Sequence, residues 1–317
     1  MKKERPTPRK KTANFFDYEN FFVPKVIPSK YLKFRPLSLP DPLDEDKTLR
    51  ALIPGRYYFS HEDDTLRLIA WKCKTKSTKK GVWDLTDSSA FPVPDTAFNQ
   101  TKVSQLSYMK SENGTRYAVL VFGTCNQNEI YPEGRFSCAY MGIAIFQQNG
   151  KSWDLQYFDP FTGCVGQFAH VPELHPIKIS TNTFLYYYMQ PTSGFGTYEA
   201  NLEVGGIIHN KLVNLATQEE TENNFGNYDS TISWTSKIEI DSLDKSECPD
   251  LSIITEGKVL SPKKLDTGNY TLPYLPKELL KTFHHSKKPS LDFKYKTQYH
   301  FQNNEYKRIK QGVVEVG

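Results

Sequence analysis

The sequence has little that would place it in a membrane or in a familiar enzyme class. Its 317 residues contain no apolar run of about 18 residues, the length that a membrane-spanning helix needs. The basic start of the chain runs into polar residues instead of an apolar segment, so no signal peptide is recognised. P-loop, Gly-x-Gly-x-x-Gly, His-Glu-x-x-His and Gly-x-Ser-x-Gly motifs are also missing, which lowers the expectation of an enzyme without excluding one.

An excess of one charge is missing as well. Lys and Arg number 40 against 36 Asp and Glu, a net charge of +4. A nucleic-acid-binding protein usually concentrates a larger basic excess on one face, so no specific nucleic-acid partner is expected. Lysines gather at residues 2–11 and 72–80. A solvated tail and a solvated loop are the main interpretation of these clusters, and an anionic partner is the alternative.

Cysteines are few, and none forms a Cys-x-x-Cys pair, so a cysteine-based zinc site is not expected. Cys125 ends one apolar run and Cys138 begins the next. A hairpin would bring the two opposite each other, which predicts a Cys125–Cys138 disulfide, with two buried thiols as the alternative. The disulfide implies a periplasmic or extracellular protein whose export signal was removed; without it, the chain is expected in the cytoplasm.

Aromatic residues, in contrast, are abundant, with 20 Phe and 19 Tyr. Aromatic and β-branched residues pack well on a pleated surface and favour strands. Roughly fourteen strand-like segments follow residue 55, one of them the continuous stretch 205–217. The fold class predicted from this pattern is all-β, either propeller-like or built of stacked antiparallel sheets.

Local signals punctuate these strands. The Glu-Asn-Gly turn at 112–114, the Asn-Gly pair at 149–150 and the Asn-Asn pair at 303–304 predict hairpins. Residues 41–53 and 276–285 have the start signals and apolar spacing of short helices.

The prolines divide the chain into two regions. Residues 1–50 are rich in proline and aromatics and are predicted to form an extended arm that lies on the body. Residues 51–317 form a β-rich domain, with a second sub-domain as an option if the chain divides near 218–230.

Consecutive tyrosines are the most unusual feature. Because neighbouring residues of a strand point to opposite faces, Tyr57-Tyr58 and Tyr186-Tyr187-Tyr188 place aromatic rings on both faces. Tyrosine is favoured at protein interfaces, so these five residues are the candidate partner-binding residues. The alternative is a sheet covered on both sides by other parts of the chain.

The acidic loop 241–251 is the only candidate for a metal site. Asp241, Asp244 and Asp250, together with Glu247, are hard oxygen ligands of the kind that calcium prefers, although Lys245 lies among them and no glycine forms the turn. A solvated hairpin loop is the alternative, and no other cofactor is expected. About twenty residues, this loop and the following DLSIITEG, resemble the FG-GAP-like repeats of integrin-type propellers. The resemblance implies a propeller that binds another protein or a glycan.

Together these patterns favour binding over catalysis. The leading interpretation is a non-enzymatic, protein-binding β protein of a bacterial envelope, such as an inhibitor or a toxin-neutralising immunity protein. One alternative is a carbohydrate-active hydrolase with paired carboxylates in a propeller cleft. Another is a structural or adhesive component of a surface.

Overall fold

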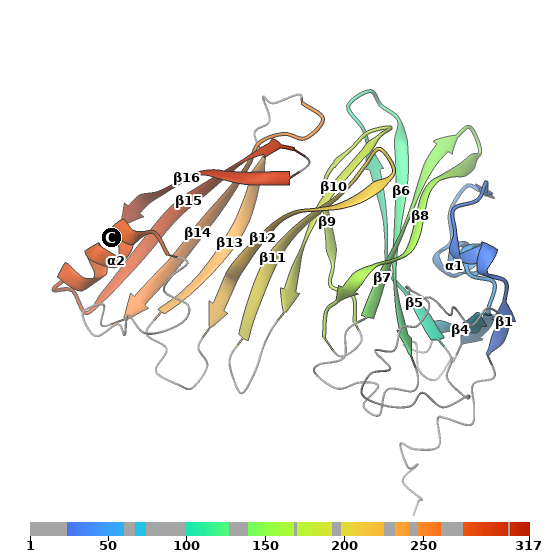
Figure 1. Cartoon of the computed structure of the whole chain (residues 1–317), viewed down its shortest axis with the longest axis horizontal. Coiled ribbons are helices and arrows are strands. Elements are labelled where there is room, and N and C mark those ends of the chain that lie inside the picture. The colour runs from blue at the N-terminus through green and yellow to red at the C-terminus, as the bar shows by residue number, and fades with distance from the viewer. Residues whose placement is uncertain are drawn as a thin grey trace, which may run out of the picture.

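The computed structural model describes residues 24–59, 67–73, 99–126, 139–167, 170–191, 198–224, 232–240, 246–260, 275–303 and 305–317. The strands of this part form two sheets of eight strands each (Figure 1). The predicted all-β class with two short helices is therefore confirmed, as antiparallel sheets instead of propeller blades. No helix among the described residues is long and apolar enough to cross a membrane.

The first sheet has the strand order β1-β4-β5-β6-β7-β8-β2, and β3 adds to β4 beside this path. All its pairs are antiparallel except β1 with β4. Its strands are β1 (Lys25–Ile27), β2 (Ser38–Pro40), β3 (Arg56–Phe59), β4 (Arg67–Cys73), β5 (Asn99–Lys110), β6 (Arg116–Asn126), β7 (Ala139–Asn149) and β8 (Ser152–Val165).

The second sheet is an antiparallel meander in which every strand pairs with its neighbours in the chain. The chain passes from the first sheet to the second between β8 and β9, whereas residues 218–224 lie within β12. The strands are β9 (Leu174–Ile179), β10 (Thr183–Pro191), β11 (Tyr198–Ile208), β12 (Lys211–Asn224), β13 (Ile232–Ile240), β14 (Leu251–Leu260), β15 (Ser290–Gln302) and β16 (Glu305–Val316).

Residues with positive φ mark the hairpin turns. Gly114 (φ 87°), Gly150 (φ 59°) and Asn303 (φ 55°) lie in the three predicted turns. The prediction of one strand over 205–217 is wrong, because His209 (φ 50°) and Asn210 (φ 60°) form a turn between β11 and β12. A two-residue turn with both φ values positive is the type that matches strand twist, and histidine is a less obvious signal for it than glycine.

Both predicted helices form. In α1 (Glu45–Leu52) the Asp44 carboxylate accepts a hydrogen bond from the Lys47 amide at 2.8 Å, which caps the first turn. In α2 (Lys277–His285) the buried residues Leu279 and Phe283 face the second sheet. Each helix therefore covers an apolar sheet face.

The central strand β6 shows that the first sheet is buried on both sides. Alternate residues Ala118, Leu120 and Phe122 join a core with α1 and the segment that precedes it. The residues between them, Tyr117, Val119 and Val121, pack against the second sheet. Within residues 24–50 of the predicted arm, β1 and β2 join the two ends of the first sheet, and the 3₁₀ turn Ser29–Leu32 and the start of α1 cover one of its faces. Residues 1–23 lie outside the described part.

The second sheet curves round a core of its own. On β10, Phe184 and Tyr186 face the first sheet, and Leu185 between them faces the opposite way. Leu185 packs in one cluster with residues of β14, β15 and β16, strands that are far from β10 in the sheet order. β16 also contacts β12, which is not its neighbour in the sheet order, so the sheet is curved.

Two glutamine side chains fix the crossing between the sheets. Gln105 on β5 donates to the Leu174 carbonyl oxygen and accepts from the Leu174 amide, both at 3.0 Å. Gln190 accepts from the Gly166 amide at 2.8 Å. At Gly166 (φ 77°) an added Cβ would lie 1.7 Å from the carbonyl oxygen of His170, so only glycine fits the turn. The side-chain amides of both glutamines therefore bond to backbone groups at the crossing, in the place of the backbone partners that a neighbouring strand would provide.

An aromatic ring lies over a glycine on the neighbouring strand in three places. The cross-strand pairs are Phe122 with Gly142, Tyr186 with Gly205, and Phe293 with Gly257. A Cβ added to Gly257 would lie 2.4 Å from both the Phe293 ring and the Ser233 carbonyl oxygen. Glycine is therefore needed at these positions, because a side chain would occupy the space that the aromatic ring fills.

We expect Gly257→Ala to lower the free energy of unfolding by about 1–3 kcal/mol, the usual cost of overpacking a core. Gly163→Ala on β8 is the control, because no atom lies within 4 Å of its added Cβ. Urea unfolding followed by tryptophan fluorescence measures both variants. Equal midpoints for the two would show that Phe293 moves aside without cost.

Candidate functional site

The first tyrosine pair is engaged by the chain itself. The Tyr57 hydroxyl donates to Asp46 Oδ2 at 2.6 Å, and the Arg50 guanidinium lies 5.1 Å from the centre of its ring. Burial and the Asp46 carboxylate raise the pKa of Tyr57 to about 12. Tyr58, on the opposite face, packs against Leu68. This strand therefore presents half-buried rings, not a free aromatic surface.

The tyrosines of β10 are also covered on both faces. Tyr186 lies between the two sheets, where burial raises its pKa well above the ordinary value. Tyr188 packs against the same core, and burial followed by the Glu203 carboxylate raises its pKa to about 12. Tyr187 faces the other way and stacks on His175, with 4.8 Å between ring centroids. The tyrosines of β10 therefore fit the alternative interpretation, in which other parts of the chain cover both faces of the sheet. Tyr186 is not accessible to a partner.

The cysteines differ from the predicted pairing. Cys125 keeps its thiol, as do Cys73 and Cys248, so the Cys125–Cys138 bridge is not supported. Cys164 on β8 is the disulfide-bonded cysteine, and Cys138 lies outside the described residues. The predicted hairpin exists as β6 and β7, and its described register ends at the pair Thr124–Tyr140, one residue before Cys125. On the other side of β6, Cys125 is opposite Gln100 of β5.

Of the predicted calcium ligands, Asp241 and Asp244 lie outside the described residues. Asp250 Oδ1 and His300 Nδ1 form a hydrogen bond of 2.7 Å, and about half of each side chain is exposed. The described residues contain no group of three or more His, Cys, Asp or Glu side chains placed to hold a metal ion. Calcium binding at this loop therefore stays a prediction.

The end of the same loop is anchored to the junction of the sheets. Lys178 Nζ donates to the Ser246 carbonyl oxygen at 2.6 Å and lies 3.2 Å from Glu112 Oε1. Thr183 donates a short hydrogen bond to Glu247. Lys178 is only 14% exposed and connects β9, the β5–β6 hairpin and the loop before β14. These contacts tie the loop to the junction of the two sheets.

Exposed apolar side chains concentrate instead on the last strand. Among the described residues, Ile309 (58% exposed), Val313 (37%) and Val314 (57%) belong to the large hydrophobic side chains left in solvent. All three lie on β16, which among the described strands pairs with β15 alone and forms the edge of the second sheet (Figure 1). β16 also contacts β12 without pairing with it in the described ladders. We call Ile309, Val313 and Val314 the β16 edge patch. This patch is hard to predict from the sequence, because a lone valine or isoleucine on a strand is usually buried.

Two β-bulges shape this edge. The register of β15 with β16 shifts between Lys294 and Tyr295 and between Gln298 and Tyr299. These shifts leave Val314 and Ile309 without a partner on β15 in the ladder. A bulge redirects the side chain of its extra residue, and here both redirected side chains are apolar and exposed.

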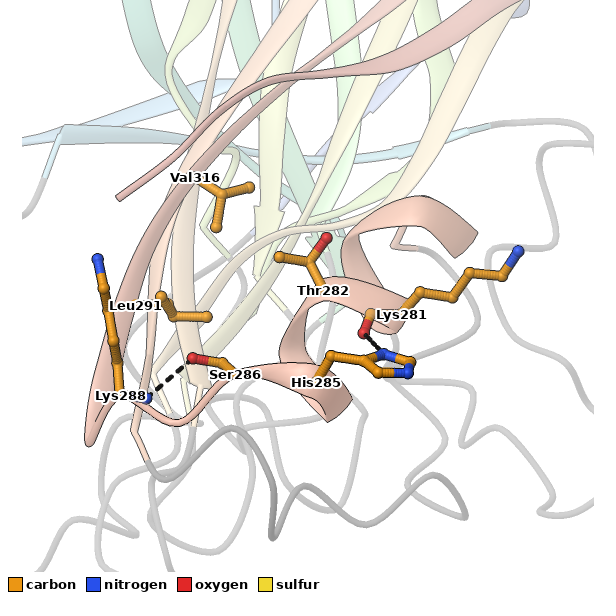
Figure 2. Close-up of a pocket in the computed structure, with 7 residues that line it drawn as sticks. All are labelled: Lys281, Thr282, His285, Ser286, Lys288, Leu291 and Val316. Atoms are coloured by element: carbon orange, nitrogen blue, oxygen red, sulfur yellow. Dashed lines mark hydrogen bonds between the residues drawn. The ribbon is translucent and has the colours of Figure 1, made fainter.

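A shallow pocket of about 490 Å³ lies beside the end of this strand, between the last turn of α2 and the β15–β16 pair. Figure 2 shows Lys281 and Lys288 on opposite sides of the pocket, with Thr282, Leu291 and Val316 between them. The residues that line it are Lys281, Thr282, His285, Ser286, Lys288, Leu291 and Val316.

The pocket combines cations with an apolar floor. None of the described residues that line it is acidic. Within the described ranges neither Lys281 nor Lys288 forms an ion pair. His285 Nδ1 is hydrogen-bonded to the Lys281 carbonyl oxygen at 2.7 Å, so this nitrogen is already engaged within the helix. The sequence of this segment predicts a helix but gives no signal for a pocket, because the pocket forms only where α2 meets β15 and β16.

Comparison of the chain with models of known families, with curated proteins and with solved structures gives no match.

We expect Lys178→Met to destabilise the protein, because it removes a charged hydrogen bond and an ion pair and leaves the Ser246 carbonyl oxygen without this donor. A loss of about 1.5–3 kcal/mol is typical of a hydrogen bond to a charged group. The control is Lys237→Met, whose ion pair with Glu239 is exposed. Equal unfolding free energies for the two variants, measured in urea, would contradict a structural role for Lys178.

We expect non-reducing peptide mapping to find Cys164 linked to Cys138. Cys73, Cys125 and Cys248 keep their thiols, so among the five cysteines of this chain only Cys138 is left to pair with Cys164. A peptide that links Cys164 to Cys125 instead, or five alkylated thiols in the unfolded and unreduced protein, would refute this pairing.

Proposed function

We propose that this chain is a protein-binding β protein that takes up an extended segment of another protein along the free edge of β16. The observation that carries the proposal is the β16 edge patch, which leaves apolar side chains in solvent on an edge strand of 12 residues. An edge strand has backbone donors and acceptors that can pair with a further strand, and such strand addition is a common way to bind extended peptides.

The edge patch gives the backbone pairing an apolar component. Val313 and Val314 are neighbours in sequence, and Ile309 lies further along the same strand. Burial of an exposed Val or Ile side chain contributes about 1.5–3 kcal/mol, which corresponds to about a tenfold or greater change in affinity. Each of the three side chains is therefore able to add measurably to binding.

Charge on the strand favours an acidic partner. Lys307, Arg308 and Lys310 surround Ile309 in the first half of β16. Lys307 is paired with Glu305 at 3.1 Å, whereas Lys310 is exposed and no ion pair of it is present among the described residues. A segment that alternates apolar and acidic residues matches both the patch and these cations.

Bulges and lysines also occur on edges that proteins protect from aggregation. Protected edges usually carry charged side chains or proline as well as bulges, whereas exposed apolar side chains on an edge mark a surface that associates with another chain. Here the extra residues are Ile309 and Val314. Apolar residues at these positions favour a binding edge.

A periplasmic or extracellular location is part of the proposal. The disulfide at Cys164 supports it, because structural disulfides persist in oxidising compartments. An inhibitor or immunity protein of a bacterial envelope is the class that we favour, since strand addition needs no catalytic group.

The test uses a fluorescently labelled peptide of alternating valine and glutamate, with binding measured by fluorescence anisotropy. We expect Val314→Lys to weaken binding about tenfold through loss of the apolar contact. The control is Val26→Lys. The exposed fraction of Val26 is 56%, compared with 57% for Val314, and Val26 lies on a different strand, the three-residue β1. Both variants are expected to keep the unfolding free energy within about 0.5 kcal/mol.

Backbone methylation separates strand addition from simple apolar contact. Methyl groups on the amides of alternate residues remove the donors along one edge of the peptide, so one of the two methylation patterns is expected to abolish binding and the other to preserve it. The proposal fails if both methylated peptides bind as the parent does, or if Val26→Lys weakens binding equally. It also fails if the protein forms a dimer that Val314→Lys dissociates, because a second copy then occupies the edge.

A further inference from the structure

From the pocket beside α2 we infer a second element of recognition: it binds an acidic side chain near the amino-terminal end of the segment that pairs with β16. This inference rests on the proposed strand addition and adds the chemistry that selects one segment over another. The occupant is the carboxylate of a glutamate or aspartate in the partner protein.

The pocket and the edge patch are continuous along β16. Val316 lines the pocket, and Val313 and Val314 precede it on the same strand. A strand that pairs antiparallel with β16 begins beside Val316 and runs toward Ile309. Its first residues therefore come to the pocket, whereas its later residues cover the edge patch.

The electrostatics of the pocket select a carboxylate. Lys281 and Lys288 flank it, and no acidic side chain among the described lining residues neutralises them. The floor of Leu291 and Val316 is apolar, and Leu291 is 4% exposed, so a bound carboxylate loses part of its water. A charged pair gains strength where water is displaced. In Figure 2 the ammonium groups of Lys281 and Lys288 lie at opposite outer ends of the pocket, so these flexible side chains turn inward to pair with a bound carboxylate.

Hydrogen bonds already hold the frame of the pocket. Thr282 donates to the Glu278 carbonyl oxygen at 2.9 Å, and Ser286 Oγ accepts from the Lys288 amide at 3.1 Å. These contacts fix the last turn of α2 and the start of the segment that carries Lys288. The backbone of both lysines is therefore placed before a ligand arrives, and only their side chains need to be ordered.

The experiment uses peptides in which valine alternates with glutamine and a single glutamate stands either first or last. We expect the peptide with glutamate first to bind about tenfold more tightly than the peptide with glutamate last. The double variant Lys281→Gln/Lys288→Gln is expected to remove this difference. The matched control is Lys277→Gln/Lys287→Gln, which changes the same charge at exposed lysines that do not line the pocket.

The outcomes separate this inference from the proposed function. If no peptide binds, the proposed strand addition fails. If the peptides bind and depend on Val314 but the position of glutamate has no effect, only the pocket inference fails. Equal losses for the two double variants would show a general charge effect and overturn it. Binding of phosphatidylglycerol vesicles that requires Lys281 and Lys288, without any preference among the peptides, would overturn it in favour of a lipid headgroup.

Discussion

The structure depends on the burial of β6 and its neighbours from both sides. An antiparallel sheet can usually leave one face in water. Here the odd-numbered residues from Tyr117 to Val121 meet the second sheet, and the even-numbered residues from Ala118 to Phe122 meet the layer of α1. Removal of either cover would expose an apolar surface too large for a soluble sheet. The amino-terminal layer and the second sheet are therefore both required by the composition of one strand.

The same constraint explains which tyrosines are available. A run of three aromatics on one strand must send rings to both faces: Tyr186 and Tyr188 meet one cover and Tyr187 meets the other. Tyr186 has room only because Gly205 lies opposite it. The tyrosines of β10 thus serve the core, whereas the edge strand β16 carries exposed aliphatic side chains.

Much of the fold could be predicted from the sequence, because local rules decide it. The Asn-Gly turns, the helix with Asp44 as its cap and the alternation along β6 follow from the residues themselves. The turn at His209 and Asn210 could not be found in this way, since neither residue is a strong turn signal in that order. The candidate site was harder still. Exposure of Val314 results from a bulge, and the pocket arises where α2 meets β15 and β16, so both depend on packing that the sequence does not display.

The meander of the second sheet has a consequence for how the molecule forms. From β10 to β16 each strand pairs with the one just before it in the chain. Closing a short loop costs less conformational entropy than closing a long one, so most of these pairings need only a modest search, whereas β14 and β15 are joined through residues 261–289. All-β proteins commonly fold slowly because their contacts join distant residues. In this sheet the curvature that brings β16 to β12 requires long-range closure. We therefore expect the hairpins to assemble early and the curved core to form last, as the slow step of folding.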